Sequence, residues 1–225
     1  MIPVITIRPA LRSARTVNEG AAAGLPIQVF PLSEAHPVDW SGPDPRGIDG
    51  LLVGSANAFR HGGKELARYA GKPVFAVGPA TARAAQRAGF LVRLAGDGGL
   101  QAVLGLIRER PVRLLRLAGA RHVPIDPPQD IVVTTCEVYA VETLPMPDSM
   151  AAVLRDGAVI LLHSAGSAEH LRAECERLGI DLSRLRLAAL GPRIAAAAGP
   201  GWGMVRWAEQ PADGALLALA ADMCH

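Results

Sequence analysis

The sequence lacks the features that mark several classes of protein. Lys and Arg outnumber Asp and Glu by only 23 to 21 in 225 residues, and no basic run is interleaved with aromatic residues, so we expect no nucleic-acid partner. No apolar run is long enough to span a membrane. The start, MIPVITIRPA, has no basic region or cleavage site of a signal peptide. The three cysteines are far apart and odd in number, which predicts a reducing, cytoplasmic location.

Common catalytic and cofactor motifs are also missing. No G-x-G-x-x-G follows the first predicted strand, and Gly62–Lys64 lacks the rest of a phosphate-binding loop. The six histidines are scattered, so we expect no metal site. His163 stands beside Ser164, but adjacent residues at a strand end point apart, and the G-x-S-x-G context of a hydrolase nucleophile is missing. The sequence therefore offers few strong catalytic groups.

Short apolar runs alternate with helical patterns along the chain. Leu100, Val103, Leu104 and Ile107 share one helix face, and Ala168, Leu171, Cys175 and Leu178 repeat that spacing. Apolar runs between such helices are typical of strands buried on both faces of a parallel sheet. The predicted strands are 4–7, 27–30, 50–53, 73–77, 90–94, 113–117, 131–135, 158–162, 186–190 and 204–207.

An internal repeat indicates the architecture. GLLVGSANAF at 50–59 aligns with VILLHSAGSA at 159–168, and AVGPATARAA at 76–85 aligns with ALGPRIAAAA at 189–198. Ten strands divided between two copies give five each, the number in a flavodoxin-like sheet. Periodicity alone divides the chain near residue 111. The segment 113–133 could instead close the first sheet cyclically, and the residues leave both divisions open.

The repeated turns are candidate anion sites. Gly78 and Gly191 each follow a strand and precede a proline, which suits the first helical position. Exposed amides at a helix start favour anions, and the carboxyl edge of a parallel sheet is where ligands bind. Thr81 lies in the first turn after Gly78. Ser55 and Ser164 are predicted helix N-caps, followed by Asn57 and Ser167. Either Gly-Pro turn by itself is explained by its suitability as the start of a helix, but its occurrence in both copies favours a role in ligand binding.

These motifs, in this order, resemble the uroporphyrinogen-III synthase family over nearly the whole chain. The matching segments are VITIRP, LLVGSANAF, VFAVGPATARAAQRAGF, LLRLAG, CEVYAVET, ILLHSAGSAEHL, LAALGPRIAAAA and AEQPADGALLAL. The resemblance implies an α/β fold of two flavodoxin-like lobes with parallel five-stranded sheets and a two-stranded linker. One lobe then comprises 1–32 and 143–225, the other 38–135, and the linker strands 33–37 and 136–142. In the family the active site lies in a cleft between the lobes.

The implied activity is that of a cyclising hydro-lyase of heme and porphyrin biosynthesis, which closes hydroxymethylbilane to uroporphyrinogen III with loss of water and inversion of ring D. The family uses no cofactor or metal. We expect a cytoplasmic monomer that takes its substrate from hydroxymethylbilane synthase. Tyr139 matches the family tyrosine and is the catalytic candidate. The expected substrate-binding residues are Arg8, Ser55, Ala56, Asn57, Gly78, Thr81, Ser164, Gly191 and Arg193.

The sequence departs from the family pattern at three places. Gly54-Ser55 stands where a Thr-Ser pair is common, Arg193-Ile194 replaces a hydroxyl residue in the second Gly-Pro turn, and the helix expected after LAGAR is replaced by the proline-rich HVPIDPPQD. The departure at Arg193 keeps an alternative open: a two-lobed protein that binds a polycarboxylate or tetrapyrrole and senses it without turnover.

Overall fold

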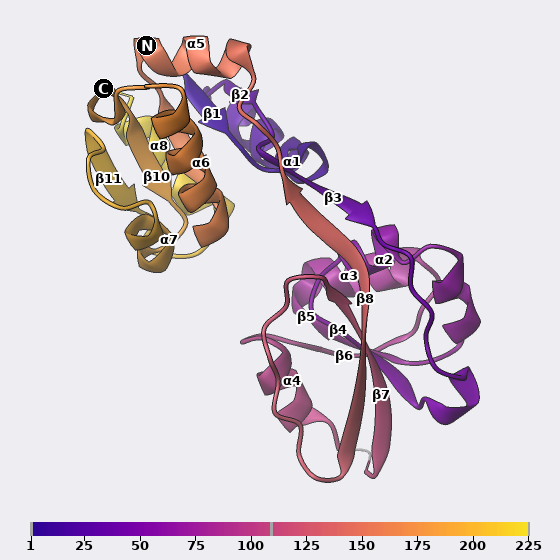
Figure 1. The fold of residues 1–225 in the computed structure, drawn as a ribbon. Helices are drawn as coiled ribbons and strands as arrows, with labels where there is room; N and C mark the ends of the chain where they lie inside the picture. Colours follow the sequence, from indigo (N-terminus) through magenta and orange to yellow (C-terminus); the bar gives the residue numbers. More distant parts are fainter. Residues whose placement is uncertain (1, 109, 225) are drawn as a thin grey trace. The chain divides into compact units, whose positions relative to one another are not determined.

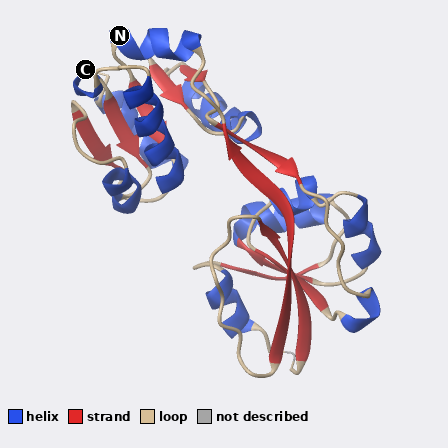
Figure 2. Cartoon of the chain, in the orientation of Figure 1, coloured by secondary structure: helices blue, strands red, loops and turns tan. Residues whose placement is uncertain are grey.

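The computed structural model describes residues 2–108 and 110–224, with the side chain of Leu11 left out. The chain forms two compact units: unit 1 is Met1–Glu34 with Thr143–His225, and unit 2 is Ala35–Glu142. Figures 1 and 2 show both units as sheets flanked by helices. No helix in the described part of the chain is long and apolar enough to cross a membrane.

Unit 1 contains one parallel sheet with strand order β11-β10-β9-β1-β2. We number the five strands 1 to 5 in the order in which they occur along unit 1. Read from β2 to β11, the sheet then has the flavodoxin order 2-1-3-4-5. Side chains of α5, α6 and α7 pack on one face, and those of α1 and α8 on the other. The strands are β1 (Val4–Thr6), β2 (Ile27–Val29), β9 (Val159–Leu162), β10 (Arg186–Ala189) and β11 (Met204–Trp207); the helices are α1 (Ala10–Ala22), α5 (Asp148–Asp156), α6 (Ala165–Arg177), η3 (Leu182–Arg184), α7 (Pro192–Ala197) and α8 (Asp213–Asp222).

Unit 2 contains a six-stranded sheet with order β3-β8-β7-β4-β5-β6. Side chains of α2, η2 and α3 pack on one face, and α4 packs on the other. The strands are β3 (Ser33–Pro37), β4 (Gly50–Val53), β5 (Val74–Val77), β6 (Val92–Gly96), β7 (Val112–Gly119) and β8 (Ile131–Thr143); the helices are η1 (Pro45–Gly47), α2 (Asn57–His61), η2 (Lys64–Tyr69), α3 (Gly78–Arg87) and α4 (Leu100–Leu106).

The strand order of unit 2 is a cyclic permutation of that of unit 1. β7 pairs with β4 on one side and with β8 on the other, both in parallel. If β7 is counted first, β8-β7-β4-β5-β6 again reads 2-1-3-4-5. The five predicted strands are present, and β3 is a sixth. β3 is the predicted linker segment 33–37. It adds to the edge of the sheet beside β8, and the six-stranded sheet is mixed.

The connection from β7 to β8 contains no helix, as the prolines in HVPIDPPQD predict. Residues 120–124 of this connection are exposed, and Ile125 packs on the same face of the sheet as α4. Arg116 of β7 is buried, and its Nη2 donates a hydrogen bond to the Val123 carbonyl of this connection over 2.8 Å. A side chain of the sheet therefore holds the connection in place of a packed helix.

Candidate functional site

Each sheet has a switch point, where the chain reverses its direction of winding and the carboxyl ends of two strands leave a crevice. In unit 2 this point lies between β7 and β4, and in unit 1 between β1 and β9. The turn Ser55-Ala56-Asn57 follows β4, Arg8 follows β1, and Ser164 follows β9. The fold therefore places Arg8, Ser55 and Ser164 at the switch point of their own unit, whereas the two Gly-Pro turns follow β5 and β10, each one strand further along its sheet.

The turn after β4 is held by its own side chains. The Asn57 N–H donates to Ser55 Oγ over 3.3 Å, and Asn57 Oδ1 accepts from Arg60 Nη1 over 3.3 Å. Ala56 and Asn57 are buried, and Ser55 is half-buried. Ala56 rather than Ser55 is the N-cap, because α2 begins at Asn57. The Ser55 hydroxyl still accepts from an amide of the helix start.

The two Gly-Pro turns differ in conformation. Gly78 has a φ of 72° and begins α3, so this turn needs a glycine. Thr81, in the first turn of α3, is 4% exposed. Gly191 has a φ of −173°, an extended conformation open to any residue, and it precedes the short helix α7. Arg193 is exposed on α7. The sequence repeat is thus not a repeat of backbone geometry, and only the first copy requires a glycine.

Tyr139 lies on β8 at an irregularity in the β7–β8 pairing. Ala118 is opposite Glu137, whereas Gly119 is opposite Tyr139, so β8 carries one extra residue there. The ring of Tyr139 covers Gly119: a Cβ on Gly119 would lie 2.8 Å from Tyr139 Cε2 and Cζ. The Tyr139 ring also packs near the imidazole of His61 in α2, and the centroids of the two rings are 6.3 Å apart. Tyr139 is therefore positioned by the end of β7 and by the helix that follows the Ser55 turn.

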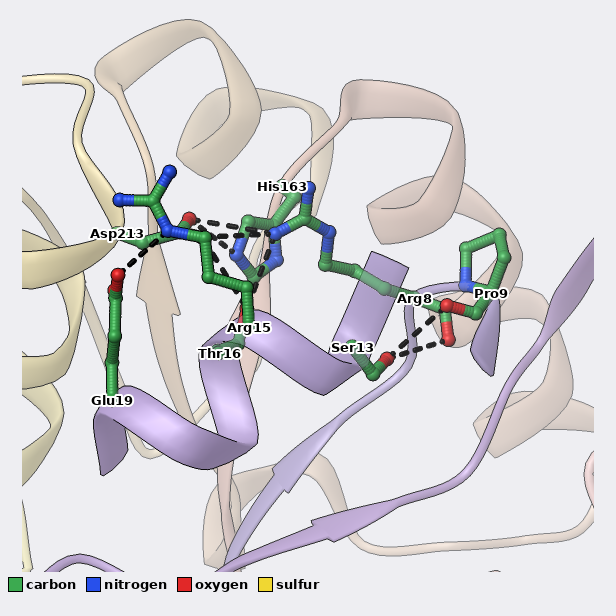
Figure 3. Close-up of polar contacts among 8 residues, drawn as sticks. All are labelled: Arg8, Pro9, Ser13, Arg15, Thr16, Glu19, His163 and Asp213. Carbon is green, nitrogen blue, oxygen red and sulfur yellow. Dashed lines mark hydrogen bonds and ion pairs between the residues drawn. The ribbon is translucent and has the colours of Figure 1, made fainter. Parts of the chain in front are cut away.

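Arg8 lies in a polar cluster between the sheet of unit 1, α1 and α8 (Figure 3). Arg8 Nη1 donates to Thr16 Oγ1 over 3.2 Å and to the Asp213 carboxylate over 3.3 and 3.4 Å. Thr16 Oγ1 also donates to Asp213 Oδ2, over 3.3 Å. His163 Nε2 is 3.3 Å from Asp213 Oδ1, but outside hydrogen-bond geometry. The guanidinium predicted to attract substrate is thus already an ion-pair partner.

The charges of this cluster follow from its contacts. The contact with His163, the charge of Arg8 and the Thr16 hydroxyl lower the pKa of Asp213 to about 2, against the opposing effect of burial. Burial lowers the pKa of His163, and the positive charge of Arg8 acts in the same direction. At neutral pH, Asp213 is therefore an anion and His163 is neutral. Sequence reasoning assigned no role to Asp213, because it is 205 positions from Arg8, and it considered His163 only as a partner of Ser164.

Ser164 caps α6, as predicted: its Oγ accepts from the Ser167 N–H over 3.2 Å. The two hydroxyls are also 2.7 Å apart. We expect Ser164→Ala to lower the free energy of unfolding by about 1 kcal/mol, because a helix-start amide loses its acceptor. Denaturant unfolding followed by circular dichroism measures this loss. Ser164→Asn should restore most of it, and equal stability of the alanine variant and the parent protein would contradict the cap.

Comparisons with known proteins agree on one family. A family model described as uroporphyrinogen-III synthase HemD matches residues 15–218. No curated protein matches the chain with significance. The fold is similar to that of the uroporphyrinogen-III synthetase of Helicobacter pylori 26695, with a TM-score of 0.68 and 16% identity over 99% of this chain and 100% of that one.

A second similar structure is a mutant uroporphyrinogen III synthase of the extremely thermophilic bacterium Thermus thermophilus, with a TM-score of 0.51 and 18% identity over 100% of this chain and 99% of that one. Identities this low establish the fold alone, whereas the family model covers most of the sequence. The two flavodoxin-like sheets and the family match together assign the protein. The chain belongs to the uroporphyrinogen-III synthase family.

Proposed function

We propose that the protein is a uroporphyrinogen-III synthase, which cyclises hydroxymethylbilane to uroporphyrinogen III with loss of water and inversion of ring D. The observation that carries the proposal is the placement of Tyr139. This residue lies on β8 opposite Gly119, the last residue of β7, and its ring contacts Gly119 and His61 of α2. The carboxyl end of β7 borders the switch point between β7 and β4, and a phenol over that end can donate a proton or a hydrogen bond to a ligand bound there.

The other predicted residues suit a substrate with many carboxylates. Hydroxymethylbilane bears an acetate and a propionate on each of its four rings. The helix starts after β4 and β5 offer backbone amides and the residues Ser55, Asn57 and Thr81. Unit 1 adds the Ser164 cap and Arg8. Such groups hold carboxylates without burying many full charges, so we propose that they bind the substrate's side chains.

The proposed reaction needs little acid or base strength from the protein. The pyrrole nitrogen of the hydroxymethyl-bearing ring helps to expel the hydroxyl group and gives up its proton, so that water leaves and an azafulvene forms. The substituted position of ring D then attacks the methylene carbon of the azafulvene. The spiro intermediate then fragments and recloses with ring D inverted. The protein's main contribution is to hold the flexible chain so that this attack is the nearest one. We propose that the Tyr139 hydroxyl donates a hydrogen bond to the leaving hydroxyl.

One assay tests this function. Hydroxymethylbilane is generated in situ by its synthase, the products are oxidised, and the porphyrin isomers are separated by chromatography. We expect the type III isomer in the presence of the protein. The type I isomer alone, which is the spontaneous product, would leave a protein that binds without turnover. We also propose that the protein acts as a cytoplasmic monomer and that the synthase hands over its unstable product.

Gly119 provides a test of how precisely Tyr139 must lie. Gly119→Ala would place a methyl group 2.8 Å from two carbons of the Tyr139 ring, and the ring must tilt away. We expect kcat to fall roughly tenfold, since small misplacements of a catalytic group are costly, with a thermal midpoint close to that of the parent. Gly105→Ala is the control, because a Cβ there meets no atom within 4 Å. Equal kcat values for the two variants would contradict this requirement.

A further inference from the structure

We propose that Asp213 is a positioning residue: with Thr16 it holds the Arg8 guanidinium by one nitrogen, and the opposite edge of the guanidinium binds a carboxylate of the substrate. This inference rests on the proposed function and adds to it a residue of α8. The sequence resemblance made Arg8 an expected substrate-binding residue and assigned no role to Asp213.

The hydrogen bonds of Arg8 all converge on one atom. Nη1 donates to Thr16 and to both oxygens of Asp213. Within the described part of the chain, no hydrogen bond or ion pair engages Arg8 Nε or Nη2. Figure 3 shows the same arrangement, with the contacts of Arg8 on the side of Asp213 and Thr16. Nε and Nη2 form the edge of an arginine that binds a carboxylate through two parallel hydrogen bonds.

Burial and position suit a binding edge. The Arg8 side chain is 21% exposed and that of Asp213 16%, whereas Thr16 is fully buried. The anchor is therefore inside the unit, whereas part of the Arg8 side chain reaches the surface. Arg8 follows β1, and β1 lies beside β9 at the switch point of this sheet. The open edge thus belongs to a residue at the position where parallel sheets bind ligands.

A second carboxylate beside Asp213 is acceptable only if the charge of Asp213 is already compensated. Asp213 is the first residue of α8 and accepts from Thr16 as well as from Arg8. A helix start stabilises a negative charge. Asp213 therefore does not depend on Arg8 alone, and the guanidinium retains attraction for an incoming anion. The buried imidazole of His163, which is neutral at neutral pH, adds no charge that would compete with Arg8 for that anion.

A double-mutant cycle tests whether Asp213 acts through Arg8. The variants are Arg8→Met, Asp213→Ala and the double variant, with kcat and KM measured for type III isomer formation. We expect Arg8→Met and Asp213→Ala each to raise KM about tenfold with kcat within about threefold, because uniform binding is lost. The double variant should be no worse than Arg8→Met alone. Independent, multiplying effects would overturn the proposal, and so would a lower KM in Asp213→Ala, which would make Asp213 a competitor for Arg8.

Two further variants test the geometry of the guanidinium. Arg8→Lys keeps the charge but has no planar edge, so its KM should resemble that of Arg8→Met; recovery by lysine would overturn the proposal. Asp213→Asn keeps one oxygen acceptor for Arg8 Nη1 and should give an intermediate KM. This variant replaces Asp213→Ala in the cycle if the alanine variant folds poorly. Glu19→Ala is the matched control: it removes the partner of Arg15 at 2.6 Å in the neighbouring, exposed ion pair of Figure 3 and should leave KM unchanged.

An equilibrium measurement separates this inference from the proposed function. Uroporphyrin III, the stable oxidised product with the same eight carboxylates, is titrated into each variant and followed by fluorescence. Its Kd should rise about tenfold in Arg8→Met and Asp213→Ala and stay constant in Glu19→Ala. Type I isomer alone from the parent protein would reject the proposed function. Type III isomer together with an unchanged Kd in both variants would reject only the inference about Asp213.

Discussion

Tyr139→Phe is expected to lower kcat about a hundredfold, the lower range for loss of a proton or hydrogen-bond donor in a transition state. KM should stay within about threefold, because the hydroxyl is proposed to contact the leaving group mainly as its bond breaks. The phenylalanine ring keeps the contacts with Gly119 and His61, so the fold should be preserved. Initial rates of type III isomer formation measure the change.

Tyr69 is the matched control, because it is the other tyrosine of the chain. It is fully buried, and its hydroxyl donates to the Pro43 carbonyl over 2.7 Å. Tyr69→Phe should lower the free energy of unfolding by about 1 kcal/mol through loss of this bond and leave kcat unchanged. Full turnover by Tyr139→Phe, or an equal fall in kcat for the two variants, would remove the chemical role of Tyr139.

The largest effect on stability is expected at Glu174 of α6, which is 8% exposed. Its Oε2 accepts from the Met146 N–H over 2.6 Å, and Arg177 donates to both oxygens over 2.9 and 2.7 Å. Glu174→Ala leaves a buried amide without an acceptor. We expect a loss of about 2–3 kcal/mol in the free energy of unfolding at pH 7. Glu176→Ala, which breaks an exposed pair with Arg172, should cost about 0.5 kcal/mol or less.

The contribution of Glu174 to the free energy of unfolding should also depend on pH. Arg177 and the Met146 amide lower the pKa of Glu174 from 4.5 to about 2. A carboxyl whose pKa is depressed by folding stabilises the protein above its unfolded pKa, and this stability is lost as the pH falls through the folded value. The difference between the parent and Glu174→Ala should therefore shrink between pH 4.5 and 2. A difference that stayed constant over this range in denaturant titrations would contradict this account.

Most of the fold could be predicted from local patterns. β4 and β10 occupy the predicted runs to within one residue, because strands buried on both faces are continuously apolar. β11 also lies at the predicted 204–207, although it is a largely exposed edge strand. β6 was predicted at 90–94 but lies at Val92–Gly96, since Phe90 packs in the core before the strand begins. β8 continues eight residues beyond the apolar run at 131–135, to Thr143, and so includes the segment 136–142 that the family resemblance implied as a linker strand. This second part is mostly exposed or half-buried and lacks the apolar run from which the strand at 131–135 was predicted.

The candidate site could be predicted only where one segment determines it. The Ser164 cap is local and was found. The contacts of Arg8 with Asp213 join chain segments that no local pattern relates. The Tyr139 ring is aimed by an extra residue in β8 and by the missing side chain of Gly119, and both depend on the pairing register. Distant ion pairs and register shifts are tertiary properties, so they emerged only from the structure.

The division of unit 1 into two chain segments has a consequence for its biosynthesis. β1 pairs with β9, and Val4 lies opposite Val159, so the strands flanking Ala35–Glu142 complete one sheet. On the ribosome, β1 and β2 emerge first but remain a two-stranded pair, which is too small to be stable. Unit 2 is continuous and can fold as soon as it has emerged. The amino-terminal segment therefore waits for the carboxyl-terminal one, and the middle of the chain reaches its native structure before either end.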